Sequence, residues 1–406
     1  MSKNKKVTRR EFLEKSAIGT AGLTLTSSFG APAFHANPNP SDVLGVGFIG
    51  VGVRGIQHVR DVMNIPGTKI LGICDIYTGH MERALKTVND PDVKSYIDYR
   101  ELLENKDIDA VVIATPDHWH SKMTVDAANA GKDIYIEKGL TRTLAGAKAI
   151  VKAVKKNKSV LQLGHQGRSR ASTARAREIW NSGILGDVSL IMMTSLDNSF
   201  EDRIHWRWYS NYGNFEIPPD ADEQHIDWQR FLGDAPQRPF DLRRYFHWRC
   251  YWDYGTGIAG DEFSHTFDGV NAVTGLGIPK TCVASGGVYY WHDDREVPDL
   301  WNVIYDYPDR SLAMTYTRNK SASGSGIVQG GTHYCGHNAT LSGGSVYLEP
   351  YNDKNLEVIE KLREERRQQG KEVGRREAIP VDTPSRDEEQ LITSHMQNFI
   401  DCVRTR

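Results

Sequence analysis

Three features that often decide a protein's class are scarce in this chain: paired cysteines, excess charge and long apolar runs. Its five cysteines are spread over 406 residues without the Cys-x-x-Cys spacing of zinc sites and redox motifs. A formal net charge of −2 provides no basic excess for binding nucleic acid or an anionic membrane surface. No segment reaches the ~20 consecutive apolar residues of a transmembrane helix. We therefore expect mostly buried thiols, no nucleic-acid partner and no membrane-spanning helix.

Two short histidine groups are the strongest candidates for metal ligands. His118-Trp119-His120 and His333-Tyr334-Cys335-Gly336-His337 each place two imidazoles close together in the sequence. Neither group has the ligand spacing of a common zinc site, so we expect no bound metal.

The N-terminal segment has the order of features of an export signal. A lysine-rich start leads into the twin-arginine pattern Thr8-Arg9-Arg10-Glu11-Phe12-Leu13 and a weakly apolar run over residues 17–29. Small-residue cleavage candidates follow at Ala31-Pro32-Ala33 and Phe34-His35-Ala36. The run is too short to span a bilayer. The sequence therefore predicts a signal peptide over residues 1–36, export by the twin-arginine translocase, and a periplasmic mature protein that does not insert into the membrane.

A Gly-x-Gly-x-x-Gly turn formed by Gly50, Gly52 and Gly55 follows a short apolar strand and opens a helical pattern. In such turns the first glycine permits the tight turn and the second lets the backbone approach a pyrophosphate. The third allows close helix–strand packing, and the helix N-terminus presents free N–H groups to the anion. We therefore predict a dinucleotide site here, with Val53 and Arg54 of the same loop taking part.

The choice between NAD and NADP depends on Asp75, which ends the next apolar strand 20 residues after Gly55. A carboxylate at this position accepts hydrogen bonds from the ribose hydroxyls and repels a 2′-phosphate. The following Ile76-Tyr77 supplies no cation to compensate. Arg54 is the one residue that argues for NADP, and contact with pyrophosphate or solvent is its alternative role. We expect NAD, with NADP less favoured.

The order of predicted elements divides the chain into two parts. Residues 43–165 alternate apolar strands with helices, which predicts a parallel, doubly wound Rossmann sheet in a domain over residues 37–165. Its strands are expected at residues 45–49, 69–74, 110–114, 133–136 and 160–163. After Gly164 a helix near residues 173–181 precedes strands at residues 188–195, 281–290, 301–307, 312–317, 339–342 and 346–348. This succession predicts a separate second domain over residues 166–406 with a largely antiparallel or mixed sheet.

Three polar motifs are candidates for the chemistry. Thr115-Pro116-Asp117-His118-Trp119-His120 and Glu137-Lys138-Gly139 follow two predicted parallel strands, and doubly wound folds bind ligands at such carboxyl ends. Asp261 and His265 lie four residues apart in a third motif and share one face if a helix begins there. A carboxylate one turn from an imidazole can hold its tautomer and stabilise its charged form. The alternative is that this pair only packs a domain interface.

Taken together and in this order, the motifs resemble the glucose–fructose oxidoreductase/inositol dehydrogenase/rhizopine catabolism family, Gfo/Idh/MocA. The resemblance covers residues 43–406 and includes two segments found in exported members, at residues 227–233 and at Trp248-Arg249. It implies hydride transfer between a nicotinamide ring and a sugar or cyclitol carbon. It also implies that the second domain is of the α/β class and that its large open sheet makes contacts in a homo-oligomer. Family members usually continue beyond the last helical stretch at residues 388–403, so the chain is expected to be truncated or to have lost a closing segment.

The resemblance also assigns roles to residues. It implies that Lys138 is the catalytic lysine, with Asp261 and His265 as its catalytic partners, and leaves open whether Lys138 or His265 is the base. Gly139 stands where the family has proline, which frees the backbone after the lysine. The expected cofactor-binding residues are Gly50, Gly52, Val53, Arg54, Gly55, Asp75, Thr115, Pro116, His118, His120, Glu137 and Gln166.

Trp206, Arg207, Trp248 and Arg249 belong to a long aromatic segment and are the expected substrate-binding residues. Trp faces stack on sugar C–H surfaces and Arg binds hydroxyls, although an aromatic core is the competing explanation. Three functions stay open: an NAD-dependent oxidoreductase of sugars or polyols, a glycoside hydrolase or lyase that oxidises its sugar transiently, and a non-catalytic sugar-binding protein. Because the periplasm offers no nicotinamide pool, the cofactor is expected to be tightly bound.

Overall fold

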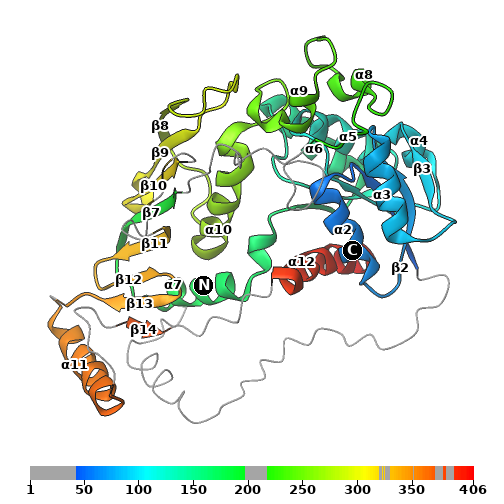
Figure 1. The fold of residues 1–406 in the computed structure, drawn as a ribbon. Coiled ribbons are helices and arrows are strands. Elements are labelled where there is room, and N and C mark those ends of the chain that lie inside the picture. The colour runs from blue at the N-terminus through cyan, green and yellow to red at the C-terminus, as the bar shows by residue number, and fades with distance from the viewer. Residues whose placement is uncertain are drawn as a thin grey trace.

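The computed structural model describes residues 43–196, 217–319, 322, 324, 330–350, 352–370, 378–380 and 388–406. These residues form a six-stranded and an eight-stranded sheet, which lie on the two sides of the molecule in Figure 1. In the described part, no helix is long and apolar enough to cross a membrane. The predicted signal peptide and the predicted substrate residues Trp206 and Arg207 lie outside the described residues.

The first sheet is fully parallel, with the strand order β3-β2-β1-β4-β5-β6. Its strands are β1 (Leu44–Ile49), β2 (Thr68–Cys74), β3 (Lys94–Tyr96), β4 (Ala110–Ile113), β5 (Asp133–Ile136) and β6 (Leu161–Leu163). The strand order reverses at β1, between β2 and β4, so the crevice beyond their carboxyl ends is the topological switch point. This confirms the predicted doubly wound sheet.

Each connection between successive strands of this sheet carries a helix: α2 (Val53–Met63), α3 (Thr78–Val88), α4 (Tyr99–Glu104), α5 (Asp117–Asn129) and α6 (Leu144–Asn157). The best-defined apolar face belongs to α2, where Ile56, Val59 and Val62 recur every three residues and are fully buried. They pack on Val46 and Phe48 of β1. Burial of each such side chain contributes about 1.5–3 kcal/mol, so this face fixes the helix that follows the glycine-rich turn.

The second sheet has the order β14-β13-β12-β11-β7-β10-β9-β8 and is antiparallel except where β7 pairs with β10. Its strands are β7 (Val188–Leu196), β8 (Thr281–Gly287), β9 (Leu300–Tyr307), β10 (Leu312–Asn319), β11 (Gly331–Gly336), β12 (Ala339–Ser342), β13 (Ser345–Leu348) and β14 (Ala378–Pro380). The expected open, mixed sheet is therefore confirmed.

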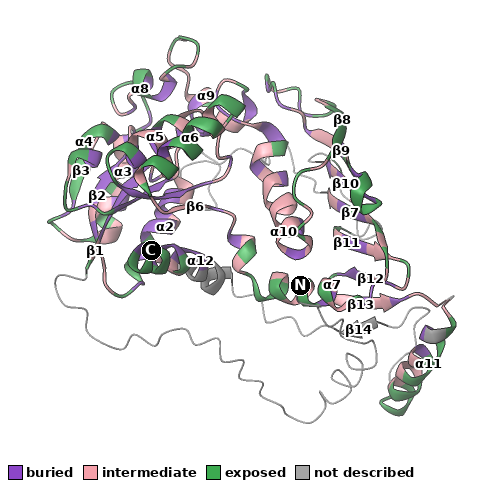
Figure 2. Cartoon of the chain, turned by 180° about the vertical axis from the view of Figure 1, so that it is seen from behind, coloured by how far each residue is buried: buried purple, intermediate pink, exposed green. Residues whose placement is uncertain are grey.

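Two helices, α7 (Ala171–Ser182) and α10 (Ser264–Thr274), pack on one face of the second sheet through Ile179, Val270 and Val273. The apolar side chains of Val283, on the edge strand β8, and of Ile304, on the neighbouring β9, are exposed. Figure 2 shows this contrast with the first sheet, whose strands are largely buried. A charged helix, α11 (Asp353–Gln368), follows β13 and lies at the periphery (Figure 1).

Two segments that come late in the chain pack on the first domain. The segment carrying α8 (Trp228–Leu232) and α9 (Leu242–Phe246) forms an aromatic cluster with Tyr77, which follows β2. The last helix, α12 (Glu388–Thr405), buries Phe399 and Ile400 in the core of the Rossmann sheet beside α2 (Figure 1). The division of the chain into two domains between residues 165 and 166 stays a prediction. The α8–α9 segment and α12 both come after this boundary in the sequence, yet they pack on the domain that precedes it.

Candidate active site

A cavity of about 970 Å³ lies at the switch point of the first sheet and is lined by residues of both domains. Its volume is at the upper end of the usual range for ligand pockets, about 300–1,000 Å³. The glycine-rich turn, the ends of β2, β4 and β5, the α8–α9 segment and the start of α10 all contribute to its wall. An elongated ligand placed there contacts the Rossmann domain at one end and α10 at the other.

The three glycines of the turn have three different surroundings. Gly50 has a φ of +82°, and a Cβ there would lie 2.9 Å from the Ala114 carbonyl oxygen. A Cβ at Gly55 would lie 2.1 Å from the Gly50 oxygen, so this position enforces close packing. Gly52 instead lines the cavity as the N-cap of α2, which has no side-chain cap. The surface of Gly52 at the N-terminus of α2, where no side chain caps the helix, fits a pyrophosphate.

Asp75 lines the same cavity and is ionised. Its oxygens accept hydrogen bonds from the Val51 amide at 2.8 Å and the Tyr77 amide at 2.9 Å. Burial raises the pKa of the carboxyl, but the His80 ring at 3.4 Å and the two amides outweigh burial and lower the pKa below its usual value. A carboxylate has lone pairs left for a ribose diol.

We predict that Asp75→Ala weakens the preference for NAD over NADP by at least about tenfold, mainly because repulsion of the 2′-phosphate is lost. Asp75→Asn removes the charge and keeps a hydrogen-bonding side chain, so it separates repulsion from ribose binding. Calorimetric titration of nucleotide-free protein with both dinucleotides measures the change. Tight NADP binding by the unaltered protein contradicts this role.

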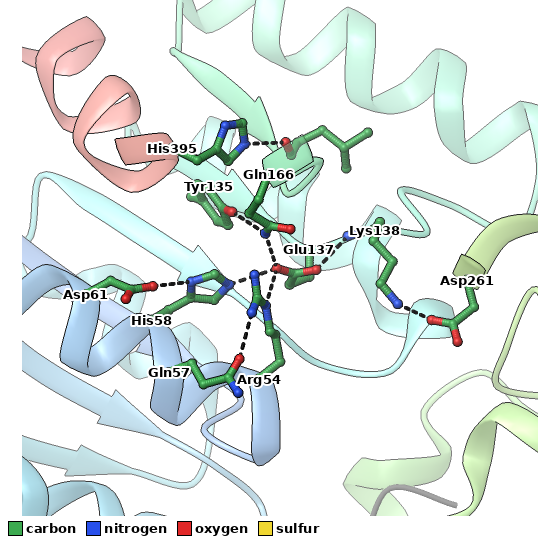
Figure 3. Close-up of polar contacts among 11 residues, drawn as sticks. Arg54, Gln57, His58, Asp61, Tyr135, Glu137, Lys138, Gln166, Asp261 and His395 are labelled. Atoms are coloured by element: carbon green, nitrogen blue, oxygen red, sulfur yellow. Dashed lines mark hydrogen bonds and ion pairs between the residues drawn. The ribbon is translucent and has the colours of Figure 1, made fainter. Parts of the chain in front are cut away.

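A buried carboxylate, Glu137, organises the centre of the cavity (Figure 3). Its Oε1 receives the Arg54 Nε at 3.0 Å, the His58 Nε2 at 2.8 Å and the Gln166 Nε2 at 2.9 Å. Although burial raises the pKa of Glu137, Arg54 and His58 together hold it well below the usual value. The Arg54 guanidinium is thus engaged by Glu137 and by Gln57. These contacts with Glu137 and Gln57 are neither of the two roles expected for Arg54, which were binding of a 2′-phosphate and contact with pyrophosphate or solvent.

Lys138 and Asp261 form an ion pair across the cavity, as Figure 3 shows. Asp261 also receives the Arg249 Nε at 3.4 Å. It lies in a π-helical turn, Ala259–Phe263, that runs directly into α10, and such turns often occur at functional sites. The sequence pattern predicted that Asp261 orients His265, whereas the structure brings Asp261 to the lysine of the other domain.

His265 lines the cavity one turn after Asp261. Its pKa is lowered to about 4, because burial disfavours the charged ring and the positive charges of Lys138 and His165 add to that effect. The ring is therefore neutral near pH 7 and has a lone pair that can accept a proton. Lys138, Asp261 and His265, the three predicted catalytic residues, all line the cavity.

Gly139, in place of the family's proline, lies at a close contact between the two domains. A Cβ there would be 2.9 Å from the Thr256 Oγ1 and 3.2 Å from the Asp117 Oδ2. Thr256 donates to Asp117 at 2.5 Å, and the Gly139 oxygen faces the His120 Nδ1 at 2.7 Å. The backbone after the lysine is thus held by neighbouring side chains.

The remaining predicted cofactor residues fall into two groups. Val53, Thr115, Pro116 and Gln166 line the cavity with the residues already described. The rings of His118 and His120 instead face main-chain carbonyls: His118 Nε2 is 2.7 Å from the Phe231 oxygen, and burial lowers its pKa to about 4. His120 Nε2 is 2.8 Å from the Thr115 oxygen. These contacts place both histidines in support of the wall, and their cofactor role stays a prediction.

Of the predicted substrate residues, Trp248 and Arg249 line the cavity, with the guanidinium 4.1 Å above the indole ring. Among the described residues, no group of three or more His, Cys, Asp or Glu side chains is arranged to hold a metal. The expectation of mostly buried thiols is wrong for Cys282 and Cys402, which are exposed on an edge strand and on the last helix.

Sequence reasoning missed lining residues on three elements. The α8–α9 segment contributes Arg230, Phe231 and Phe246, and also Tyr245, which belongs to the aromatic segment expected to bind sugar. Tyr334 of β11 and Thr173 of α7 line the part of the cavity beyond α10. The aromatic composition of residues 198–254 is the sequence signal for the lining residues of the α8–α9 segment. Tyr334 lies in a His/Cys pattern that suggests metal ligands, so the sequence does not indicate its place in the cavity wall.

Comparison with known families gives two adjacent matches that follow the two domains. The model described as an oxidoreductase family with an NAD-binding Rossmann fold matches residues 44–165. The model of that family's C-terminal alpha/beta domain matches residues 170–310. The chain belongs to the Gfo/Idh/MocA oxidoreductase family. Its first domain is accordingly an NAD-binding Rossmann domain, as the residues predicted.

The curated relatives are glycosyl hydrolases. A glycosyl hydrolase family 109 protein of Parabacteroides distasonis is 30% identical over 236 residues, which are 53% of this chain and 51% of that protein. The alpha-N-acetylgalactosaminidase of Shewanella oneidensis is 35% identical over 157 residues, 34% of each chain. The matched regions thus span about half of the first relative's length and about a third of the second's.

The similar solved structures include dehydrogenases of sugars and inositols. A levoglucosan dehydrogenase in complex with NADH has a TM-score of 0.62 at 17% identity, covering 89% of this chain and 90% of that one. The myo-inositol 2-dehydrogenase of Lactobacillus plantarum has a TM-score of 0.59 at 18% identity and covers 89% of both chains. At these identities the likeness shows that the fold is shared over both domains.

Proposed function

We propose that this protein is an NAD-dependent oxidoreductase that transfers hydride between a tightly bound nicotinamide cofactor and a carbinol carbon of a sugar or polyol. One observation carries the proposal: Lys138, Asp261 and His265 converge in the same cavity as the glycine-rich turn and Asp75. Fold similarity to sugar and inositol dehydrogenases supports it.

Oxidation of a carbinol removes a hydride from carbon and a proton from oxygen, and bound NAD⁺ supplies the hydride acceptor. Lys138, bound to Asp261, is placed to donate a hydrogen bond to the reacting oxygen. His265 is neutral and lines the same wall, so its arrangement favours it as the proton acceptor. Asp261 fixes the lysine, and Glu137 holds the backbone beside it through the Lys138 amide at 3.2 Å.

Polar and aromatic side chains that line the same cavity as Lys138 support a carbohydrate substrate. Trp248, Arg249 and Tyr334 offer an apolar face and hydrogen-bond donors, which together suit a polyhydroxylated ring. Export by the twin-arginine route and a periplasmic location belong to the proposal on the strength of Arg9-Arg10 and the run after them. Exposed Val283 and Ile304 support the expected homo-oligomer.

A second function is favoured by the curated relatives, which are named glycosyl hydrolases. In a redox-neutral cleavage the bound cofactor would serve as a transient hydride acceptor, while elimination of the aglycone and addition of water to the sugar would occur before the hydride is returned. The same three residues serve its first step. The two functions differ in whether reduced nucleotide remains at the end of turnover.

We expect free sugars or polyols to leave the bound nucleotide reduced, with one oxidised product formed for each nucleotide. The measurement is near-ultraviolet absorbance of the purified protein against a panel of polyols, free sugars and chromogenic glycosides. Aglycone release without accumulation of NADH favours the second function. Inertness of Lys138→Ala towards the same panel is the control for contaminating hydrolases and dehydrogenases.

A further inference from the structure

A second, more open cavity of about 700 Å³ lies next to the active-site cavity. Its lining includes His165 and Arg168, which follow β6, Asp268 of α10 and His395 of α12. His265 does not belong to that lining but to the active-site cavity. The rings of His165 and His265 meet edge to face with centroids 5.3 Å apart, so two histidines join the two cavities.

His165 is placed between an imidazole and a carboxylate. Its Nδ1 is 3.6 Å from the Asp268 Oδ1, which also receives the Arg168 guanidinium at 2.8 Å. Its Nε2 is buried and has no hydrogen-bond partner within the described part of the chain. With Nδ1 directed to Asp268, Nε2 is the nitrogen left to accept a proton. Asp268 follows His265 by three residues on α10 and therefore lies on the same side of that helix.

The proposed reaction needs a path that carries a proton from His265 to solvent. A bound substrate covers the cavity side of His265, and a proton taken from its hydroxyl must still leave the protein. Burial and the charges of Lys138 and His165 lower the pKa of His265 to about 4, so the proton does not remain there. The two carboxylates that face His265, Glu137 and Asp261, are buried and paired with cations. Asp268 is also paired with a cation, Arg168, but it is only partly buried and lines the more open second cavity, from which a proton can reach solvent.

We propose that His165 relays the substrate's hydroxyl proton from His265 to Asp268 and the second cavity. This inference rests on the proposed oxidoreductase function and names a residue that the function did not require. The substrate O–H bond breaks as an N–H bond forms on His265. That proton passes to the His165 Nε2, directly or through one water, while the His165 Nδ1 proton goes to Asp268 and then to solvent. One proton leaves for each hydride transferred, and the reverse reaction uses the same path inwards.

The kinetic test replaces His165 by phenylalanine, which keeps the ring contact with His265 and removes both nitrogens. We expect kcat to fall at least about tenfold, with KM and bound nucleotide unchanged, since an acid–base group contributes about 10²–10⁴-fold and water can replace part of a relay. In His165→Ala, which removes the ring, added imidazole should restore kcat in a saturable manner, because the vacated position opens on the second cavity. Asp268→Asn should show a smaller loss of the same kind.

His395→Gln is the matched control. His395 lines the same cavity, but its Nδ1 contacts the Ser169 hydroxyl at 2.8 Å and its Nε2 contacts the Leu163 oxygen at 3.2 Å. We expect its kcat to stay within about twofold of wild type and to be insensitive to imidazole. Wild-type kcat in His165→Phe overturns the relay. A loss of kcat in His165→Ala that imidazole does not restore also overturns the relay, because it indicates that the His165 ring has only a packing role.

A histidine titration separates failure of the relay from failure of the proposed function. NMR of ¹⁵N-histidine-labelled holoprotein follows His265 in wild type and in His165→Gln. Because the charge of His165 lowers the pKa of His265, the substitution should raise that pKa from about 4 towards the ordinary value. An unchanged His265 titration contradicts the coupling whether or not a carbinol substrate is found. Absence of nucleotide reduction by wild type contradicts the proposed function alone.

Discussion

Lys138→Ala is expected to lower kcat by at least about 100-fold, the usual scale for removing a group that assists proton transfer. The lysine is bound to Asp261 across the cavity and has no substitute on the same strand end. Nucleotide content should not change, because Gly50, Gly52 and Gly55 are untouched. Stopped-flow measurement of nucleotide reduction, with nucleotide content determined by mass spectrometry, reports both quantities.

The control for Lys138→Ala addresses stability, because the substitution removes a cationic partner of the buried Asp261 while the contact of Asp261 with Arg249 is kept. Lys138→Gln keeps a hydrogen-bond donor and removes the charge. We expect Lys138→Gln to melt close to wild type and still to lose most of its activity. Near-wild-type turnover in either variant contradicts the mechanism. It indicates that Lys138, which is followed by Gly139 in place of the family's proline, takes no part in the reaction.

Retention of the nucleotide is the second large effect. Protein purified without added nucleotide should contain close to one NAD(H) per chain after gel filtration. Phe231, Tyr245 and Phe246 line the Asp75 end of the cavity and belong to an aromatic cluster that includes Tyr77 of the Rossmann domain. The Tyr77 hydroxyl donates a hydrogen bond of 2.8 Å to Asp220, which precedes α8. This bond holds the chain before α8 against the Rossmann domain. Release of the adenosine end therefore requires disruption of a buried interdomain cluster.

Phe246→Ala tests this directly and should raise the nucleotide release rate at least about tenfold, because it removes contacts that close the cavity. Tyr290→Ala, a truncation of an exposed aromatic residue, is the control. Stripping the nucleotide should also lower the melting temperature, since a ligand that binds only the folded state stabilises it. Folded, nucleotide-free protein that turns over only with added NAD contradicts the expectation of a tightly bound cofactor.

Local features of the site were predictable because single residues determine them. Gly50 and Gly55 each occupy a position where a Cβ collides with backbone, and such positions recur whenever a strand turns into a dinucleotide-binding helix. The cavity position of Asp75 was predictable because this residue ends the second apolar strand, 20 residues after Gly55. The doubly wound sheet follows from the alternation of apolar strands and helices, although β3 (Lys94–Tyr96) was missed because its three residues lack an apolar pattern.

Contacts between distant segments were not predictable from the sequence. The π-helical turn at Asp261 changes the direction of its side chain, and no local signal marks that extra residue. The carbonyl contacts of His118 and His120 depend on Phe231 and Gly139, which lie on other elements. The return of α12 to the Rossmann domain is likewise decided by tertiary packing, since an amphipathic pattern does not name its partner.

The central claim is hydride transfer from a substrate carbon to the bound nicotinamide. The most direct measurement uses the carbohydrate found in the panel, deuterated at the carbon that is oxidised, in a single turnover with the purified holoprotein. The nucleotide is then extracted and its mass determined. The account predicts reduced nucleotide carrying one deuterium and a primary isotope effect on its formation. Product formation with no deuterium in the nucleotide contradicts the claim.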